Sequence, residues 1–233
     1  MLSMSSKKIL VTGGNRGIGF ETCRKLSEMG HEVILTARTS DKAAQAREKL
    51  AQLGFEVQAE VLDVDQPTGF AAFAQKLGSQ HQYLDALINN AGVLLKEKLD
   101  FLSVDETTLQ QTFQTNVIGP MLLSQQLIPL LQKSSQGRIV NVSSFLGALS
   151  RMGGNYTAYR VSKAAINAFT LHLSMEYPDL VITSCHPGHV QTDMGGATAP
   201  RTIEKGAETP IWLAIDPSVS TGKFYFDKEV TDW

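Results

Sequence analysis

A glycine-rich turn near the start of the sequence restricts the possible folds more than any other feature. Residues 8–12, KILVT, predict a buried strand, and the following GGNRGIG leads into a helix that ends near Gly30. In such a turn Gly13 permits the tight bend, Gly17 permits close approach of a ligand, and Gly19 permits close contact between helix and sheet. The helix N-terminus then offers free N–H groups to a pyrophosphate. An ordinary glycine-rich loop is the alternative, but the strand–turn–helix context favours phosphate binding.

The rest of the chain alternates between strand-like and helix-like segments. Further strands are predicted at residues 32–36, 56–62, 84–89, 138–143, 180–186 and 223–227. Helices are predicted from Ser40 or Asp41 to Gly54, from Pro67 onward, after a capping box at residues 103–106, and over residues 156–177. Strands that alternate with helices of this length imply parallel βαβ crossovers. The sequence therefore predicts one α/β domain over residues 1–233, a doubly wound parallel sheet of the Rossmann type with helices on both faces.

Composition excludes several function classes. The net charge of −2 provides no basic field for nucleic acid or an anionic membrane. No apolar run approaches the ~18 residues that a membrane-spanning helix needs. The polar start, SSKK before ILV, lacks the apolar centre of a secretory signal. The two cysteines, Cys23 and Cys185, lie far apart and fit a reducing compartment. We therefore expect a cytoplasmic protein that binds neither nucleic acid nor membrane.

The end of the second predicted strand indicates which dinucleotide the turn would bind. An acidic residue there would accept a hydrogen bond from the ribose 2′-hydroxyl of NAD. Here the strand ends in Thr36-Ala37-Arg38, and Arg38 can pair with a 2′-phosphate instead. Arg16 in the glycine turn can reach the same phosphate, although solvated surface arginines are the alternative. Asp63, after the third strand, is placed either for the adenine edge or as a cap. The expected cofactor is NADP(H).

Tyr159 and Lys163 are four residues apart on a predicted helix and therefore share one face. A free tyrosine titrates near pH 10, so proton transfer near neutrality needs its pKa lowered by roughly three, equivalent to about 4 kcal/mol. An ammonium group about 4 Å away supplies an interaction of that size at an effective dielectric constant of about 20. As an isolated pattern Tyr-x3-Lys is weak, because chance and surface pairing explain most instances. Together the two residues are a candidate proton donor and its electrostatic partner.

Two further polar residues extend the candidate site. Ser144 follows the strand predicted at residues 138–143, at the carboxyl edge where such sheets bind ligands. Its hydroxyl can donate to a carbonyl oxygen that gains negative charge, or it can cap a turn. Ser143 is expected to point to the opposite face. Asn116 lies four residues before Pro120, which has no N–H. The Asn116 carbonyl thus loses its helical partner, and it either binds a water or marks a simple kink.

With these residues in order, the chain resembles the short-chain dehydrogenase/reductase family over nearly its whole length. The motifs that carry the resemblance are Thr12-Gly13-x3-Gly17-x-Gly19, Asn89-Asn90-Ala91-Gly92, the tetrad of Asn116, Ser144, Tyr159 and Lys163, and Pro187-Gly188 with Val190 and Thr192. With Asn116, Ser144 and the Tyr159–Lys163 pair counted separately, these are six motifs of moderate strength, and six in the same order are very specific. The C-terminal third, with HPGHVQTDMGG, GAETPIWLA and GKFYFDKEVTDW, is similar to the carbonyl reductases of that family.

The resemblance implies reduction of a small-molecule carbonyl by hydride transfer from NADPH. Tyr159 would give the proton to the carbonyl oxygen, and Ser144 would orient and polarise the carbonyl. Lys163 would lower the tyrosine pKa and hold the nicotinamide ribose, while Asn116 would hold a water that refills the proton. Residues 188–205 would form the substrate loop. The residues expected to bind the cofactor are Gly13, Asn15, Arg16, Gly17, Ile18, Gly19, Arg38, Asp63, Val64, Asn90, Ala91, Gly92, Tyr159, Lys163, Pro187, Gly188, Val190 and Thr192.

Two departures from the carbonyl reductases concern the substrate side. His189 stands where those reductases typically carry an aromatic residue, and only residues 145–158 separate the serine and tyrosine motifs where they carry a long insertion. Without that insertion, apolar stripes on two long helices should stay open, which predicts a homodimer or homotetramer. The alternative is a monomer. It is supported by polar residues that would keep this helix face in contact with water, such as Gln110, Gln114 and Gln125.

Several interpretations remain open for the substrate and the reaction. A group of apolar residues could line a substrate pocket or belong to the core: Phe145, Leu146, Leu149, Met152, Tyr156 and Met194. His186 and His189 have no third ligand nearby, so no metal site is expected. A β-oxoacyl thioester reductase, an alcohol or polyol dehydrogenase, and a non-catalytic NADP-sensing protein are the alternatives to a carbonyl reductase.

Overall fold

A twisted sheet forms the centre of the molecule. The computed structural model describes residues 6–95 and 101–233, and within them eight strands pair in the order β3-β2-β1-β4-β5-β6-β7-β8. Strands β1 to β7 are parallel, and β8 is antiparallel to β7. The strands are β1 (Lys8–Val11), β2 (Glu32–Ala37), β3 (Gln58–Val61), β4 (Ala86–Asn89), β5 (Arg138–Val142), β6 (Val181–Cys185), β7 (Lys223–Phe226) and β8 (Glu229–Thr231). The predicted doubly wound sheet is confirmed.

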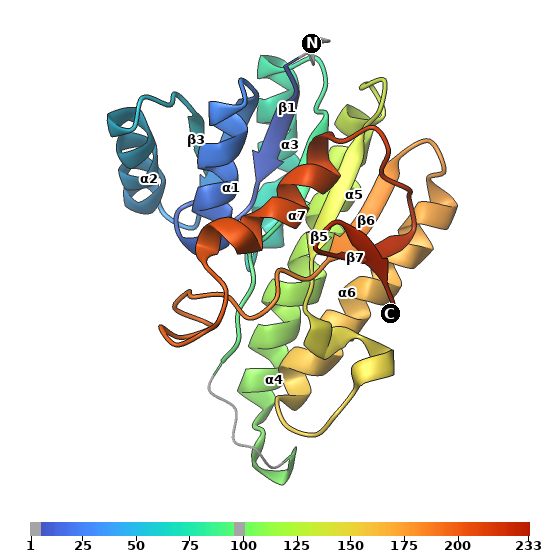
Figure 1. Ribbon diagram of the computed structural model, residues 1–233. Helices are drawn as coiled ribbons and strands as arrows, with labels where there is room; N and C mark the ends of the chain where they lie inside the picture. Colours follow the sequence, from blue (N-terminus) through green and yellow to red (C-terminus); the bar gives the residue numbers. More distant parts are fainter. Residues whose placement is uncertain (1–5, 96–100) are drawn as a thin grey trace.

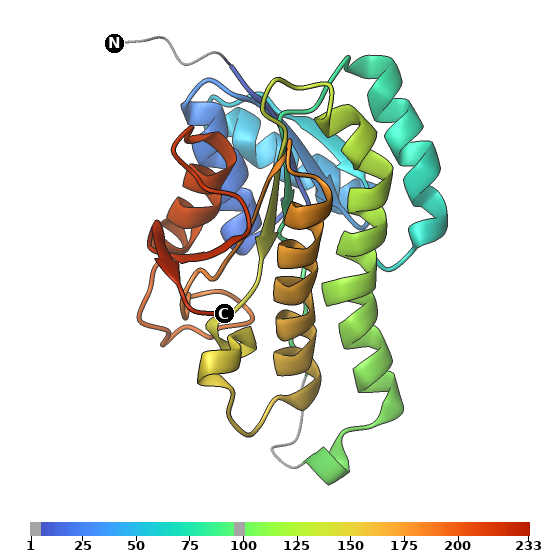
Figure 2. The same cartoon turned by 90° about the vertical axis from the view of Figure 1, so that its right-hand side faces the viewer.

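Helices cover both faces of this sheet (Figure 1). The helices are α1 (Gly17–Glu28), α2 (Ser40–Gln52), α3 (Phe70–Gln80), α4 (Glu106–Phe113), α5 (Gly119–Leu131), α6 (Thr157–Glu176) and α7 (Ile203–Ile215). Helices α1, α2 and α7 pack on one face, and α3, α5 and α6 pack on the other. Figure 2 shows the two layers from the side, with α1 and α7 to the left of the sheet and α5 and α6 to the right. No helix of the described residues has the length and apolar character needed to cross a membrane.

Alternation along the strands divides the core between the two layers. In β1, Ile9 and Val11 pack with α1, whereas Leu10 packs with α3 and α5. All three side chains are fully buried. Successive residues of a strand point to opposite faces, so a continuous apolar run such as this one fits a strand covered on both sides. Each buried side chain contributes roughly 2 kcal/mol from removal of apolar surface from water.

Two predicted helix starts are wrong in detail. Helix α2 is capped by Thr39, whose hydroxyl accepts a hydrogen bond from the Lys42 N–H, rather than by Ser40 or Asp41. The expected capping box at residues 103–106 is absent, because Asp105 caps α4 by accepting from the Thr108 N–H. In both cases the residue with extended backbone and a short oxygen-bearing side chain is the cap.

Two C-terminal elements have no counterpart in the prediction. Helix α7 begins after Thr202, whose hydroxyl accepts from the Lys205 N–H, and contains Pro210 in its interior. The proline weakens the helical pattern, although the apolar spacing of the helix is regular. Strand β8 follows a tight turn in which Asp227 and Lys228 both have positive φ, at +47° and +68°. Non-glycine residues seldom adopt such angles, so the sequence offers little sign of this hairpin.

Candidate active site

A cavity of about 580 Å³ lies at the carboxyl edge of the sheet. It is bounded by the glycine turn, by the ends of β4 and β5, and by the segment after β6. Most of the predicted cofactor residues line it, namely Gly13, Asn15, Arg16, Gly17, Ile18, Gly19, Arg38, Val64, Asn90, Ala91, Gly92, Tyr159, Lys163, Pro187 and Thr192. The strand order reverses between β1 and β4, and this is where doubly wound sheets bind their ligands.

Backbone geometry shapes the glycine turn. Gly13 and Gly17 have φ values of +64° and +53°, which favour glycine. A Cβ atom on Gly19 would lie 2.3 Å from the Gly13 carbonyl oxygen and 2.4 Å from the Asn90 side-chain nitrogen. The Thr12 hydroxyl accepts from the N–H groups of Asn90 and Ala91, each at 3.0 Å, and so joins the ends of β1 and β4. The turn is therefore closely fitted to the neighbouring strand end.

The start of α1 is open to an anion. Arg16, the N-cap residue before the helix, makes no side-chain capping bond, and the first turn contains no acidic residue. The first N–H groups of the helix therefore lack a side-chain acceptor and carry the positive end of the helix dipole. This arrangement fits a bound pyrophosphate, as the sequence predicted.

Three cationic side chains line the cavity: Arg16, Arg38 and Lys42. Arg38 comes directly after β2, and no carboxylate ends that strand. Sequence reasoning missed Lys42, although its position in the first turn of α2, four residues after Arg38, is a usable signal. Arg16 forms an exposed ion pair with Asp193 across the cavity mouth.

Three predicted cofactor residues do not line the cavity. Asp63 caps a turn, because its carboxylate accepts from the Asp65 N–H at 3.1 Å, and Asp65 lines the cavity instead. Gly188, with φ of +80°, packs against the side chain of Arg201. Val190 is buried and pairs with Arg201 in a short β-bridge. These three positions shape the segments around the cavity rather than its wall.

Tyr159 and Lys163 lie on α6 and both reach the cavity. Ser144 is a polar neighbour of Tyr159 that favours a lower pKa of its hydroxyl, and the Tyr159 hydroxyl lies 3.8 Å from the Met194 sulfur. The Lys163 ammonium donates to the Val142 carbonyl at 2.8 Å and lies 5.7 Å from the centre of the Tyr159 ring. The structure thus brings together three of the four tetrad residues.

The pKa of Tyr159 differs from the expectation. Burial raises the pKa of Tyr159, and the hydrogen bond with Ser144 lowers it by a smaller amount. Burial also lowers the pKa of Lys163 to about 8. Lys163 was expected to lower the tyrosine pKa, but desolvation dominates and the ammonium is directed to a backbone carbonyl. The phenol is therefore held in its protonated form at neutral pH.

Both serines after β5 face α6, so the expected opposite orientation of Ser143 is wrong. The Ser143 hydroxyl donates to the Lys163 carbonyl at 3.1 Å, and the Ser144 hydroxyl meets Tyr159. Strand β5 ends at Val142, so strand alternation no longer governs these two residues. Ser144 also caps the short helix at Phe145–Gly147 by accepting from the Leu146 N–H. Ser144 therefore lies beside Tyr159, as the proposed site requires, and also caps a turn, which was the alternative role.

Asn116 is buried beside the cavity without lining it. Its side-chain oxygen accepts from the Val93 N–H at 2.8 Å, and its nitrogen donates to the Val93 carbonyl and the Ser162 hydroxyl at 2.9 and 3.1 Å. The expected helix irregularity is present as a π-helical turn over Gln114–Ile118, between α4 and α5. π-turns of this kind occur often at functional sites. The water expected at the Asn116 carbonyl remains a prediction.

Comparisons with known proteins agree with this geometry. The sequence model of the short chain dehydrogenase family matches residues 7–202. The chain therefore belongs to the short-chain dehydrogenase/reductase family and is an oxidoreductase. It is 31% identical to short-chain dehydrogenase/reductase 1 of Saponaria officinalis, with 95% of this chain and 94% of that protein covered.

Two carbonyl reductases are also similar over their full length. Carbonyl reductase [NADPH] 1 of Bos taurus is 31% identical, with both chains covered completely. The NADPH-bound carbonyl reductase from chicken fatty liver is 30% identical, covers 98% of this chain and 99% of its own, and superposes with a TM-score of 0.88. The bovine alignment extends over 288 positions against 233 residues here, so the relative carries stretches that this chain lacks.

Proposed function

We propose that this protein reduces a carbonyl compound to an alcohol with NADPH, and that Tyr159 donates the proton. The observation that carries the proposal is one cavity whose wall contains both the buried Tyr159, with Ser144 as its neighbour, and the glycine turn that suits an anion. The resemblance to the bovine and chicken carbonyl reductases supports the same reaction. We regard residues 1–233 as one domain that both binds the cofactor and catalyses the reaction.

NADP(H) is the cofactor that fits this cavity. The uncapped start of α1 suits the pyrophosphate, and Arg16 and Arg38 suit the 2′-phosphate. No acid follows β2 to accept a hydrogen bond from a free 2′-hydroxyl. The names of the bovine and chicken relatives specify NADPH. Arg16 would exchange its pairing with Asp193 for the phosphate, since that ion pair is exposed and therefore weak.

The chain's own residues would manage the proton and the carbonyl oxygen. NADPH, when bound, supplies the hydride. Ser144 would orient the carbonyl and stabilise negative charge on its oxygen, and Tyr159 would transfer its proton to that oxygen. The raised pKa of Tyr159 suits this direction, because the phenol stays protonated until the oxygen becomes basic. Lys163 would return a proton, and a water on the Asn116 carbonyl would supply it.

Met194 in the cavity wall and exposed apolar side chains between the serine and tyrosine motifs favour a hydrophobic carbonyl compound. Leu149, Met152 and Met194 are 69%, 43% and 44% exposed, and Phe145 and Tyr156 also reach solvent. Exposure at these positions argues against the alternative that they belong to the core. Of these residues, Met194 lines the cavity, and exposed apolar side chains are typical of a binding surface. The loop at residues 188–205, which contains Met194, is the proposed substrate loop.

A substrate panel tests the proposed reaction. The purified protein is mixed with NADPH and with one test compound, and loss of NADPH absorbance is followed. The compounds are an aldehyde, an aromatic ketone, a quinone, a β-oxoacyl thioester and a sugar ketone that would be reduced to a polyol. We expect turnover with hydrophobic aldehydes or ketones. Exclusive turnover of the thioester would assign a fatty-acid type of reductase. Tight NADPH binding without any turnover would assign a sensing role.

We also propose that the protein is a homodimer or homotetramer and that it is cytoplasmic. On the outer faces of α5 and α6, Met121, Val161 and Met175 are 39%, 47% and 71% exposed. Part of each predicted stripe, including Leu122 and Phe169, packs into the core instead. Sedimentation at micromolar concentration tests the assembly, and a species of 25.4 kDa at all concentrations would exclude it. Two free, buried cysteines support the location, which cell fractionation would test.

A further inference from the structure

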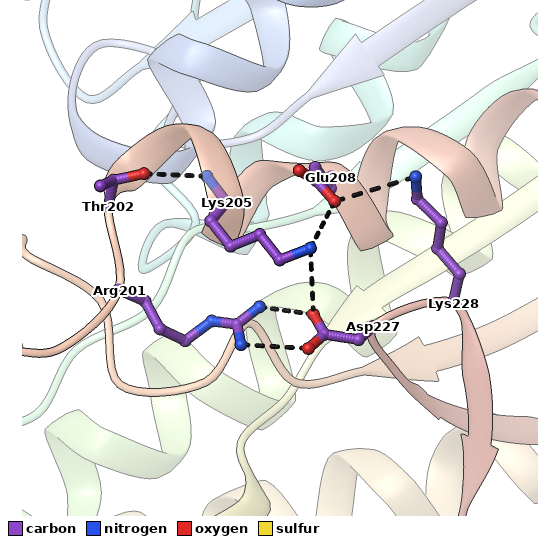
Figure 3. A network of polar contacts seen from close by, with 6 residues as sticks. All are labelled: Arg201, Thr202, Lys205, Glu208, Asp227 and Lys228. Atoms are coloured by element: carbon purple, nitrogen blue, oxygen red, sulfur yellow. Dashed lines mark hydrogen bonds and ion pairs between the residues drawn. The ribbon is translucent and has the colours of Figure 1, made fainter.

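An ion-pair network connects the substrate loop to the C-terminal hairpin (Figure 3). The Arg201 guanidinium meets both carboxylate oxygens of Asp227, with one N–O distance of 3.1 Å and the other shorter. Lys205 lies 4.0 Å from the same carboxylate, and Glu208 connects Lys205 to Lys228. The guanidinium beside Asp227 lowers the pKa of that carboxyl group. A bidentate ion pair of this kind fixes the orientation of the two side chains as well as the distance between them.

Arg201 also closes the base of the substrate loop through its backbone. Its N–H donates to the His189 carbonyl at 3.2 Å, and its carbonyl accepts from the Gln191 N–H at 2.9 Å. Its side chain lies against Gly188, where a Cβ atom would be 2.4 Å from the Arg201 Cδ. The two ends of residues 188–201 are thus held together at one residue. Between these ends the loop carries Thr192 and Met194 to the cavity.

The other partner of the pair belongs to the sheet. Asp227 occupies the tight turn between β7 and β8, and β7 pairs with β6. The preceding residue, Phe226, stacks on His186 with ring centres 4.2 Å apart, and the Arg201 guanidinium lies 5.0 Å from the same Phe226 ring. The Asp227 carboxylate is therefore presented from a paired strand end. The substrate loop is therefore attached to a paired strand end of the sheet.

We propose that Arg201 and Asp227 are positioning residues for carbonyl reduction. Their pair holds the loop so that Met194 stays beside the Tyr159 hydroxyl and Thr192 stays beside Gly17, whose Cβ position is 3.4 Å from the Thr192 methyl group. This inference rests on the proposed function. Loosening the pair would enlarge the range of loop positions and weaken binding of the carbonyl compound. The glycine turn and Arg38 would still hold the adenosine side of the cofactor.

Three substitutions test the pair. Arg201→Met keeps an apolar side chain against Phe226 and removes the charge. Asp227→Asn keeps the shape of the side chain and removes its charge. Arg201→Lys keeps the positive charge but cannot form the bidentate pair. The matched control is Arg24→Met, because Arg24 makes a comparable two-pronged pair with Glu21 within α1, at 2.8 and 2.6 Å. Each variant is compared with the parent for KM and kcat with one carbonyl substrate, for the NADPH Kd, and for amide hydrogen exchange in residues 188–200.

We expect Arg201→Met and Asp227→Asn to raise KM about tenfold, the effect of losing one charge-assisted contact, and to accelerate exchange in the loop. Their kcat and NADPH Kd should stay within about threefold of the parent, Arg201→Lys should lie between, and Arg24→Met should match the parent. Unchanged KM and unchanged loop exchange in both variants would overturn the proposal, as would an equal effect of Arg24→Met. If the parent reduces no carbonyl compound, the proposed function fails, while the exchange measurement still decides whether the pair holds the loop.

Discussion

The cofactor side and the substrate side of this cavity are built in different ways. On the cofactor side, glycines and hydrogen bonds to the backbone fix the wall: the Thr12 hydroxyl accepts from the Asn90 N–H, and Gly19 leaves no room for a Cβ beside the Gly13 carbonyl. On the substrate side, side chains from distant segments fix it, as in the pairing of Arg201 with Asp227. A wall made by backbone tolerates few sequences and keeps one shape. A wall made by side chains can change with the substrate, which fits the exposed apolar residues there.

The largest expected effect comes from Tyr159, where the two sides meet. Tyr159→Phe removes one hydroxyl from a ring that stays packed, so folding and NADPH binding should be almost unchanged. The rate of carbonyl reduction should drop by at least the ~10²-fold typical of general acid catalysis. Steady-state kinetics with a substrate found in the panel, together with NADPH titration, measures both. A variant that binds NADPH and turns over at nearly the parent's rate would remove Tyr159 from the mechanism.

The next largest effect concerns the preference for NADPH over NADH, which is determined on the cofactor side of the cavity. Arg38→Ala should lower the preference for NADPH over NADH about tenfold or more, because a charge-assisted hydrogen bond contributes roughly 1.5–3 kcal/mol. Arg47→Ala is the control, since Arg47 is exposed on α2, the helix that follows Arg38, and does not line the cavity. The ratio of kcat/KM values for the two cofactors decides. An unchanged ratio in Arg38→Ala would refute the 2′-phosphate assignment.

Two glycine substitutions test how closely the cofactor side is fitted. Gly19→Ala would place a methyl group 2.3 Å from the Gly13 carbonyl, whereas Gly154→Ala, in the loop before α6 and outside the glycine turn, would meet nothing within 4 Å. Overpacking of this kind costs about 1–3 kcal/mol, so Gly19→Ala should lower the denaturation midpoint and weaken NADPH binding. Gly154→Ala should change neither. Equal behaviour of the two variants in urea denaturation would show that the cofactor side is not closely fitted.

The smallest effect concerns the pH dependence of stability at Lys163. Burial lowers its pKa from 10.5 to about 8, so between these pH values the unfolded chain binds more protons than the folded chain. The contribution of Lys163 to the free energy of unfolding therefore rises with pH across that window. Below about pH 8, Lys163 is charged in both states, and the full cost of burying that charge lowers the stability. Lys163→Met should be inactive, and the parent should gain stability relative to it as the pH rises from about 8 to about 10. Denaturation at both pH values measures this, and a constant difference would contradict the lowered pKa.

The same contrast explains which features the sequence could predict. The glycine turn, the tetrad spacing and the alternation of strands and helices follow from local rules, such as the positive φ of Gly13 and the one-turn separation of Tyr159 and Lys163. The turn role of Asp63 and the orientation of Ser143 depend on where a strand ends, which short sequence patterns define poorly.

The features that escaped prediction depend on contacts between distant segments. Asp227 lies 26 residues from Arg201, and no local pattern pairs them. The raised pKa of Tyr159 depends on how much surrounding structure excludes water from the ring, which spacing alone does not reveal. Helix α7 was missed because Pro210 interrupts a regular apolar pattern. Long-range packing, rather than motif content, accounts for these differences.

The most direct test of the account follows the hydride itself. The parent protein is given a hydrophobic aldehyde or ketone and NADPH that carries deuterium at the nicotinamide carbon that donates the hydride. Mass spectrometry and NMR then locate deuterium in the product. The account predicts an alcohol with one deuterium on the former carbonyl carbon, and almost none of it with Tyr159→Phe over the same time. An unlabelled alcohol, or the same yield of labelled alcohol from both proteins, would contradict it.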